Sequence, residues 1–280
     1  MDLYRAVEND VSRALEEDVG SGDATADLLI PEGAMAHATV ISRENAVLCG
    51  VSWFESCFRM LDPGVEIVWQ AREGDEIKPH DALCTVRGNA RSLLTAERSA
   101  LNFLQLLSGI ATKTRKFVNA VEGTHALVMD TRKTLPGLRV AQKYAVRVGG
   151  GSNQRMGLHD AILIKENHIA ACGGVKAALA AAAKAPNVPV QIEVESMKEL
   201  EEALGAGAKL ILLDNFDIDG LKQAVEFTRG RAALEASGGV NLDTVRSIAL
   251  TGVDRISVGE LTKDVKAIDL SMRFQVTQLA

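Results

Sequence analysis

Cationic residues gather just after a short apolar run, in the stretch MDTRKTLPGLR that spans residues 129–139. Thr131, Arg132 and Lys133 come directly after what reads as a buried strand. Residues 130–168 hold seven Lys or Arg but three Asp or Glu, although the whole chain has a formal net charge of −6. Arg offers two-pronged hydrogen bonds to carboxylate or phosphate, and Lys adds a point charge. The concentration predicts a pocket for a multiply anionic small molecule.

Two further cations of this stretch, Arg155 and Lys165, lie outside the helical segment that follows. Arg155 follows a Gly-rich loop, and Lys165 ends the apolar run AILIKE. Arg139, Lys143 and Arg147 are spaced four residues apart, which places them on one side of a helix. For these three, the alternative is a solvated helix face.

Two acids, Glu193 and Glu195, alternate in the apolar run VQIEVE, so their side chains point to the same face of a strand. A third, Asp214, ends the next run, LILLD. A buried carboxylate needs a cation or a metal, and carboxylates together with substrate oxygens suit Mg²⁺. The sequence therefore predicts Mg²⁺ near Glu193 and Asp214. The alternative is a salt bridge from Glu193 to Lys165 or Arg155.

Glycine-containing loops follow the last two apolar runs. They contain Ser237, Gly238 and Gly239 in ASGG, and Ser257, Val258 and Gly259 in SVGE. Loops after the final strands of parallel barrels often bind phosphate through backbone N–H groups, and glycine permits close approach. An anionic acceptor and a phosphorylated, Mg²⁺-bound partner together indicate phosphoryl or phosphoribosyl transfer.

The elements that must position these residues form a repeating pattern after residue 108. Short apolar runs alternate with amphipathic helical stretches, which predicts βαβ units and a parallel sheet. No GxGxxG follows an early strand, and polar residues end nearly every run, which favours a barrel over an open doubly wound sheet. The runs are ALVMD, AILIKE, VQIEVE, LILLD, AALEAS and RISVG.

Residues 1–108 have a different pattern of apolar residues. Apolar spacing predicts a helix over residues 3–18, which GSGDAT ends. Short β-like runs between residues 37 and 86 enclose the helical WFESCFRML, and a long helix covers residues 92–121. This part reads as a small α+β unit.

Composition excludes several classes of protein. An acidic chain is a poor general binder of nucleic acid or anionic membranes, and no apolar run is long enough for a membrane span. The first twenty residues carry acids and helical spacing rather than a cationic apolar leader, so we expect a cytoplasmic location. Four Cys without CxxC spacing indicate reduced thiols.

The motifs TRKTLPGLR, DAILIKENHI, IEVES, LLDNF, LEASGG and DRISVG resemble those of the quinolinate phosphoribosyltransferase family. EDVGSGDAT and LLTAERSALNFLQLLSGIAT resemble its N-terminal part, so the resemblance covers nearly the whole chain. It implies a mixed α/β N-terminal domain (residues 1–108 with 267–280) plus an incomplete seven-stranded parallel α/β barrel (residues 109–266). It also implies transfer of phosphoribosyl from phosphoribosyl pyrophosphate to quinolinate, with Mg²⁺ and release of pyrophosphate and CO₂.

The resemblance also assigns roles to matching residues. A homodimer with shared sites is implied, because Arg98 resembles the family arginine that enters the neighbouring subunit's pocket. Lys133, Lys165, Glu193 and Asp214 are implied as catalytic, and Glu193 and Asp214 as partial Mg²⁺ ligands. The implied substrate-binding residues are Arg98, Thr131, Arg132, Lys133, Arg155, Lys165, Glu193, Asp214, Ser237, Gly238, Gly239, Ser257, Val258 and Gly259.

One residue departs from the family pattern. The family usually reads Asn-His-Arg where this chain has Asn153, Gln154 and Arg155. Glutamine can donate a hydrogen bond but carries no charge, so we expect weaker binding of a substrate carboxylate or a different preferred ring. Three rivals remain: a sister enzyme that uses nicotinate or another ring, a Schiff-base aldolase that uses Lys165, and a non-enzymatic binding protein.

Overall fold

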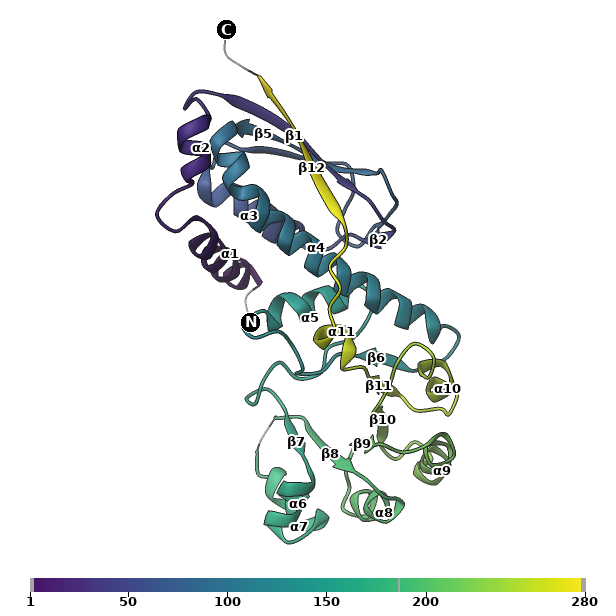
Figure 1. Cartoon of the computed structure of the whole chain (residues 1–280). Coiled ribbons are helices and arrows are strands. Elements are labelled where there is room, and N and C mark those ends of the chain that lie inside the picture. Colours follow the sequence, from purple (N-terminus) through teal and green to yellow (C-terminus); the bar gives the residue numbers. More distant parts are fainter. Residues whose placement is uncertain (1–2, 186, 278–280) are drawn as a thin grey trace. The chain divides into compact units, whose positions relative to one another are not determined.

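A computed structural model describes residues 3–185 and 187–277, with side chains described as far as residue 275 (Figure 1). The chain forms two compact units. The first contains the chain up to Lys113, Leu135–Gly150 and the chain from Asp264 onward; the second contains Thr114–Thr134 and Gly151–Lys263. Residues 135–150 thus belong to the first unit, and the predicted domain limits stay a prediction.

The first unit is built on an antiparallel sheet with the strand order β12-β1-β5-β3. Buried residues alternate along β1, as expected for a sheet with one covered face. The long helix α4 buries Leu101, Leu104 and Leu107. The strands are β1 (Met35–Ser42), β3 (Glu66–Trp69), β5 (Ala82–Asn89) and β12 (Leu270–Thr277), with the separate pair β2 (Ala46–Val47) and β4 (Glu76–Ile77). The helices are α1 (Leu3–Val19), α2 (Ala24–Leu29), α3 (Val51–Leu61), α4 (Ala90–Ala120, continuing into the second unit) and α5 (Arg139–Val148).

One residue of α1, Asp10, and one residue of α4, Gly109, have surroundings that explain their residue type. The buried carboxylate of Asp10 accepts hydrogen bonds from Trp53 Nε1 at 3.1 Å and Arg13 Nη2 at 2.7 Å, so this buried acid is satisfied. A Cβ at Gly109 on α4 would lie 2.1 Å from the carbonyl oxygen of Lys266, so glycine is required at this crossing.

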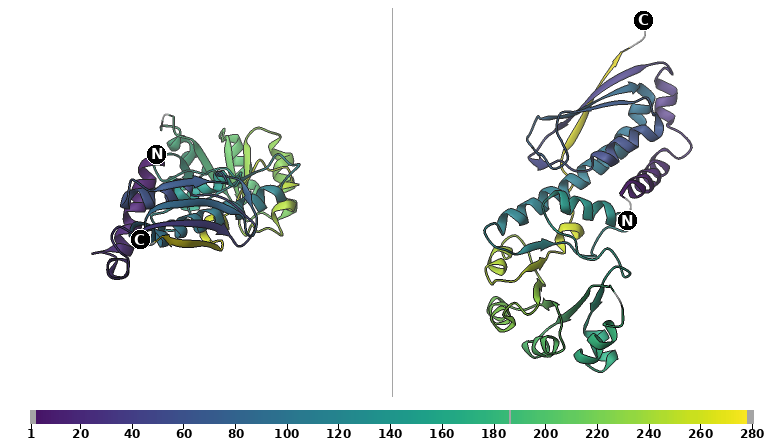
Figure 2. Two further views of the ribbon diagram at one scale, coloured as in Figure 1. Left: turned by 90° about the horizontal axis from the view of Figure 1, so that it is seen from above. Right: turned by 180° about the vertical axis from the view of Figure 1, so that it is seen from behind.

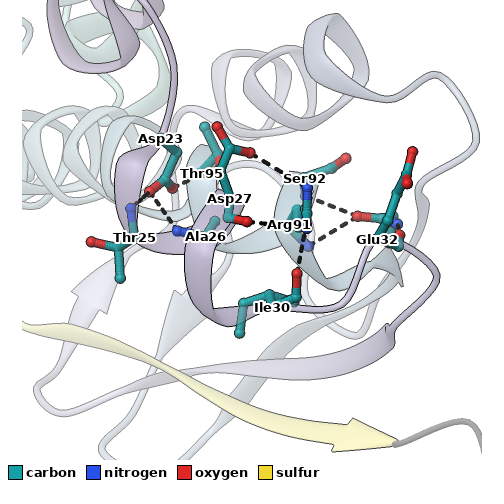
Figure 3. Close-up of polar contacts among 10 residues, drawn as sticks. Asp23, Thr25, Ala26, Asp27, Ile30, Glu32, Arg91, Ser92 and Thr95 are labelled. Atoms are coloured by element: carbon teal, nitrogen blue, oxygen red, sulfur yellow. Dashed lines mark hydrogen bonds and ion pairs between the residues drawn. The ribbon is translucent and has the colours of Figure 1, made fainter.

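The segment GSGDAT follows the end of α1, as predicted, and it also contains the start of the next helix, α2. Asp23 caps α2 by accepting from the N–H groups of Thr25 at 3.1 Å and Ala26 at 2.9 Å, and it accepts from the Thr95 hydroxyl on α4 at 2.9 Å (Figure 3). The N–H of Ala26 and the hydroxyl of Thr95 lower the pKa of Asp23. One carboxylate therefore both starts α2 and ties it to α4.

The second unit holds a parallel sheet in which all six predicted runs are strands, in the order β6-β11-β10-β9-β8-β7. The first strand of this unit, β6, pairs with its last strand, β11, as in a rolled sheet. A single parallel bridge outside these six strands joins Met129 to Ser152, where the resemblance implies seven strands in all. Among the described residues, no ladder joins Ser152 to β7, so the barrel is incomplete. The strands are β6 (Leu127–Met129), β7 (Ile162–Ile164), β8 (Val190–Val194), β9 (Leu210–Asp214), β10 (Ala233–Ser237) and β11 (Arg255–Ser257).

Strand register places polar side chains on one face of this sheet. Glu193 pairs with Leu212, Leu212 with Glu235, and Glu235 with Arg255, so all four point to the same side. Asp214 and Ser237 pair two residues further on, at the carboxyl ends of their strands. The predicted acids therefore share one face of the sheet.

Helices cover the other face, and residues that alternate with the polar ones, such as Ile192 and Ile211, are fully buried. Figure 1 and the rear view in Figure 2 show α8, α9 and α10 beside the strands that precede them. These helices are α6 (Glu166–Cys172), α7 (Val175–Ala182), α8 (Met197–Gly205), α9 (Ile218–Thr228), α10 (Val245–Ala249) and α11 (Glu260–Lys263). In the part of the chain that the structure describes, no helix combines the length and apolar character of a membrane span.

Candidate active site

The loop after β6 packs against the loop after β11. A Cβ on Gly259 would lie 3.2 Å from Lys133 Cδ and 3.9 Å from Thr131 Oγ1, so glycine leaves room for these side chains. Thr262 Oγ1 donates to the carbonyl oxygen of Lys133 at 2.8 Å, and the N–H of Lys133 donates to Thr131 Oγ1 at 3.1 Å. Two predicted parts of the site, a cation and a glycine loop, are therefore in contact.

Arg132 and Arg155 are electrostatic neighbours. Burial lowers the pKa of Arg155, and the positive charge of Arg132 lowers it further, while Asp160 acts in the opposite direction. Arg155 Nη1 donates to the carbonyl oxygen of Ala161 at 3.2 Å. Asp160 also shapes this loop by accepting from the N–H groups of Met156 and Gly157 at 2.7 and 2.9 Å. The charges of Arg132 and Arg155 oppose each other, and binding of an anionic ligand by both would offset that repulsion.

Lys165 forms an ion pair with Glu193. Its ammonium group donates to both carboxylate oxygens, at 3.0 and 2.9 Å, and Glu193 is 9% exposed against 44% for Lys165. The salt bridge that the sequence left open as an alternative is therefore present. The pair joins β8 to the residue that follows β7.

Asp214 lies beside the first glycine loop. Asn215, with φ of 56°, donates from Nδ2 to Asp214 Oδ2 at 2.8 Å, and its N–H donates to the carbonyl oxygen of Ser237 at 2.9 Å. Gly238 has φ of 104°, and a Cβ there would lie 2.1 Å from Asn215 Oδ1. Gly239 also has positive φ, at 60°, with nothing within 4 Å of its would-be Cβ.

The second glycine loop differs from the prediction in detail. The hydroxyl of Ser257 donates to the buried carboxylate of Glu235, and the N–H of Val258 donates to the carbonyl oxygen of Met129 at 2.9 Å. The Ser257 hydroxyl and the Val258 N–H, which could have bound a phosphate, therefore form hydrogen bonds within the protein. Gly259, beside Lys133, is the member of this loop that lies next to another predicted site residue.

Several predicted cations belong to the first unit. Arg98 is exposed on α4, in the first unit. Arg139, Lys143 and Arg147 also belong to the first unit, on α5. Lys143 is only 1% exposed, so the solvated-face alternative is wrong for it, because it lies on the packed side of α5 with Gln142.

Two acids to which the sequence assigned no role, Asp130 and Glu235, are buried polar residues near this site. Asp130 is fully buried and accepts from Asn153 Nδ2 at 2.6 Å and from the N–H of Gln154 at 2.8 Å. Glu235 is also fully buried, and it accepts from Gln191 Nε2 at 2.9 Å. The available signal was a polar residue at every second position of otherwise apolar strands.

Family models match almost the whole chain. The model of the quinolinate phosphoribosyl transferase N-terminal domain matches residues 23–108, and that of the C-terminal domain matches residues 110–273.

Individual relatives agree with these matches. The carboxylating nicotinate-nucleotide pyrophosphorylase of Mycobacterium leprae is 43% identical over 96% of this chain and 97% of its own length. A mitochondrial decarboxylating quinolinate phosphoribosyltransferase of Nicotiana tabacum is 39% identical, over 95% of this chain and 81% of its own length. The solved nicotinate-nucleotide pyrophosphorylase of Francisella tularensis is 44% identical, with a TM-score of 0.94 over 97% of both chains.

A mixed α/β fold with cations and acids at the strand ends of a rolled parallel sheet defines an enzyme of the phosphoribosyltransferase class. The chain belongs to the quinolinate phosphoribosyltransferase family.

Proposed function

We propose that the protein transfers phosphoribosyl from phosphoribosyl pyrophosphate to quinolinate, with decarboxylation to nicotinate mononucleotide, pyrophosphate and CO₂. The observation that carries this function is the placement of two cations at strand ends, Lys133 beside Gly259 and Lys165 against Glu193, in a chain of this family. Together with Arg132 and Arg155, these cations match a ring with two carboxylates better than a neutral ring amide.

The remaining cations complete the acceptor site. Lys133, against Gly259, and Lys165, held by Glu193, supply point charges that orient the carboxylate to be lost. They act by position and charge and form no covalent bond. The pyridine nitrogen attacks the anomeric carbon as pyrophosphate leaves. When CO₂ then departs from the cationic pyridinium, the electron pair of the broken C–C bond stays on the ring carbon, which takes up a proton from solvent.

The acids serve the ribose side. Glu193 and Asp214 share one face of the sheet, where carboxylates would stabilise the positive charge that develops at the anomeric carbon. Among the described residues, no group of three or more His, Cys, Asp or Glu is placed to hold a metal. We propose that Mg²⁺ is held by Asp214 and Glu193 together with substrate oxygens, with the Glu193 carboxylate shared between the ion and the ammonium group of Lys165. When bound, Mg²⁺ would neutralise the leaving pyrophosphate.

We further propose a cytoplasmic homodimer in which Arg98 of each subunit completes the other subunit's site. Its exposure on α4, in a family-matched segment, supports this assignment.

The test is incubation with quinolinate, phosphoribosyl pyrophosphate and Mg²⁺, following nicotinate mononucleotide by mass spectrometry and CO₂ by release of label. Nicotinate replaces quinolinate in a parallel reaction. Product with quinolinate and CO₂ in equal amounts supports the function, whereas turnover of nicotinate alone identifies the sister enzyme. Borohydride trapping of Lys165 with a carbonyl substrate would instead identify an aldolase.

A further inference from the structure

A buried hydrogen-bond cluster lies inside the second unit, beneath the proposed substrate site. Its centre is Glu235 on β10, which is fully buried. Gln191 Nε2 donates to Glu235 Oε2 at 2.9 Å, and Gln154 Nε2 and the Ser257 hydroxyl both donate to Oε1. Gln154 Nε2 is also 3.3 Å from Ser257 Oγ. A buried carboxylate with three donors is a satisfied and therefore rigid feature.

Each donor comes from a segment that also carries a proposed substrate contact. Gln154 directly precedes Arg155, and Gln191 stands two residues before Glu193. Ser257 is the first residue of the second glycine loop, and Glu235 stands two residues before Ser237. One carboxylate therefore connects four separate parts of the site.

Gln154 is anchored through both its backbone and its side chain. Its N–H donates to Asp130 Oδ1 at 2.8 Å, while its side chain reaches Glu235 and Ser257 on other strands. Gln154 and Arg155 also line one cavity of about 250 Å³. Arg155 directly follows this anchored residue in the chain, so the anchoring of Gln154 limits where the guanidinium of Arg155 can lie.

We propose that Gln154 is a positioning residue: its side-chain amide, anchored on Glu235 and Ser257, sets Arg155 for a carboxylate of the pyridine substrate. This inference rests on the proposed function and goes beyond it, because Gln154 itself acts through Arg155 and through no contact with the ring. A side chain of similar length that donates to Glu235 should preserve the position of Arg155. A side chain that only fills the space should not preserve it.

The test compares two variants of the full-length protein. Gln154→Met keeps the length but removes the donor, and Gln154→His restores a donor. Thr228→Val is the matched control, since Thr228 is a buried polar residue in the same unit whose Oγ1 has no hydrogen-bond partner among the described residues. For each protein, quinolinate binding is measured by calorimetry, and KM is measured for quinolinate and for phosphoribosyl pyrophosphate.

We expect Gln154→Met to weaken quinolinate binding and raise its KM about tenfold, since small displacements of a binding group are costly. The KM for phosphoribosyl pyrophosphate should change less than about twofold, and Gln154→His should recover most of the loss. Unchanged quinolinate binding in Gln154→Met overturns the inference, as does an equal loss for both substrates or a failure of Gln154→His to recover. If Gln154→Met does not fold, Gln154→Ala is judged by the same criteria.

The inference and the function can fail separately. A wild-type protein that binds quinolinate but makes no product refutes the function, while the binding comparison still decides the role of Gln154. A wild-type protein that neither binds nor converts quinolinate refutes both.

Discussion

Lys133 is exposed, and its side chain lies next to Gly259. Its backbone carbonyl oxygen accepts a hydrogen bond from Thr262 Oγ1. Replacing it with alanine should leave the fold intact, because it removes no buried group. Turnover should fall about a hundredfold or more, the usual effect of losing a positioned charge at a reaction centre. Steady-state kinetics with quinolinate would measure this. Lys222→Ala, at an exposed lysine on α9, is the control, and near-normal turnover in Lys133→Ala would contradict the assignment.

Gly238 and Gly239 form a matched pair for testing the first glycine loop. Both have positive φ, but only a Cβ at Gly238 would collide, at 2.1 Å from Asn215 Oδ1. Gly239→Ala should cost about 1 kcal/mol from backbone conformation alone. Gly238→Ala should cost about 1–3 kcal/mol more, because Asn215 must move. Urea unfolding gives both values, and equal midpoints for the two variants would show that the contact with Asn215 is unimportant.

At the scale of the element, α2 depends on the carboxylate of Asp23. The pKa of this group is lowered in the folded protein, so its stabilising effect is present above its usual value of 3.8 and is lost as the pH falls through the folded value. Asp23→Ala should therefore lower stability by about 1 kcal/mol at pH 7.

The same difference should shrink toward zero in strong acid. Urea midpoints of wild type and Asp23→Ala across pH 2–7 would test this. Asp27→Ala in the same helix, where the carboxylate is more exposed and 3.6 Å from Arg91, is the control. A difference that is constant with pH would exclude the charged cap as its cause.

At the scale of the whole molecule, shared sites predict complementation between inactive variants. Arg98→Ala and Lys133→Ala each damage one contributor to a site. In a mixed dimer, one of the two sites would combine an intact Lys133 with an intact Arg98 from the other subunit. After co-refolding, random pairing should restore about a quarter of wild-type turnover.

A mixture of Lys133→Ala with Lys165→Ala is the control, since both residues belong to one subunit's site and no intact site can form. Absence of recovery in the Arg98 mixture, with dimers confirmed by light scattering, would place Arg98 outside the neighbouring site.

Much of this architecture is determined by local sequence patterns. The six apolar runs are all strands, and the helices predicted near residues 3–18 and 92–121 are α1 and α4, because burial on both faces and helical periodicity leave clear signatures. The positions of Asp214 and the glycines at strand ends follow from the same runs.

The tertiary structure decided what sequence patterns leave open. Strand register determined that Glu193, Glu235 and Arg255 share a layer. Long-range contacts determined that Glu193 pairs with Lys165, that Ser257 and Gln154 turn inward to Glu235, and that α5 joins the first unit. A residue type and its spacing determine which groups a strand presents at its end. Which groups meet depends on partners brought together only when the sheet rolls up.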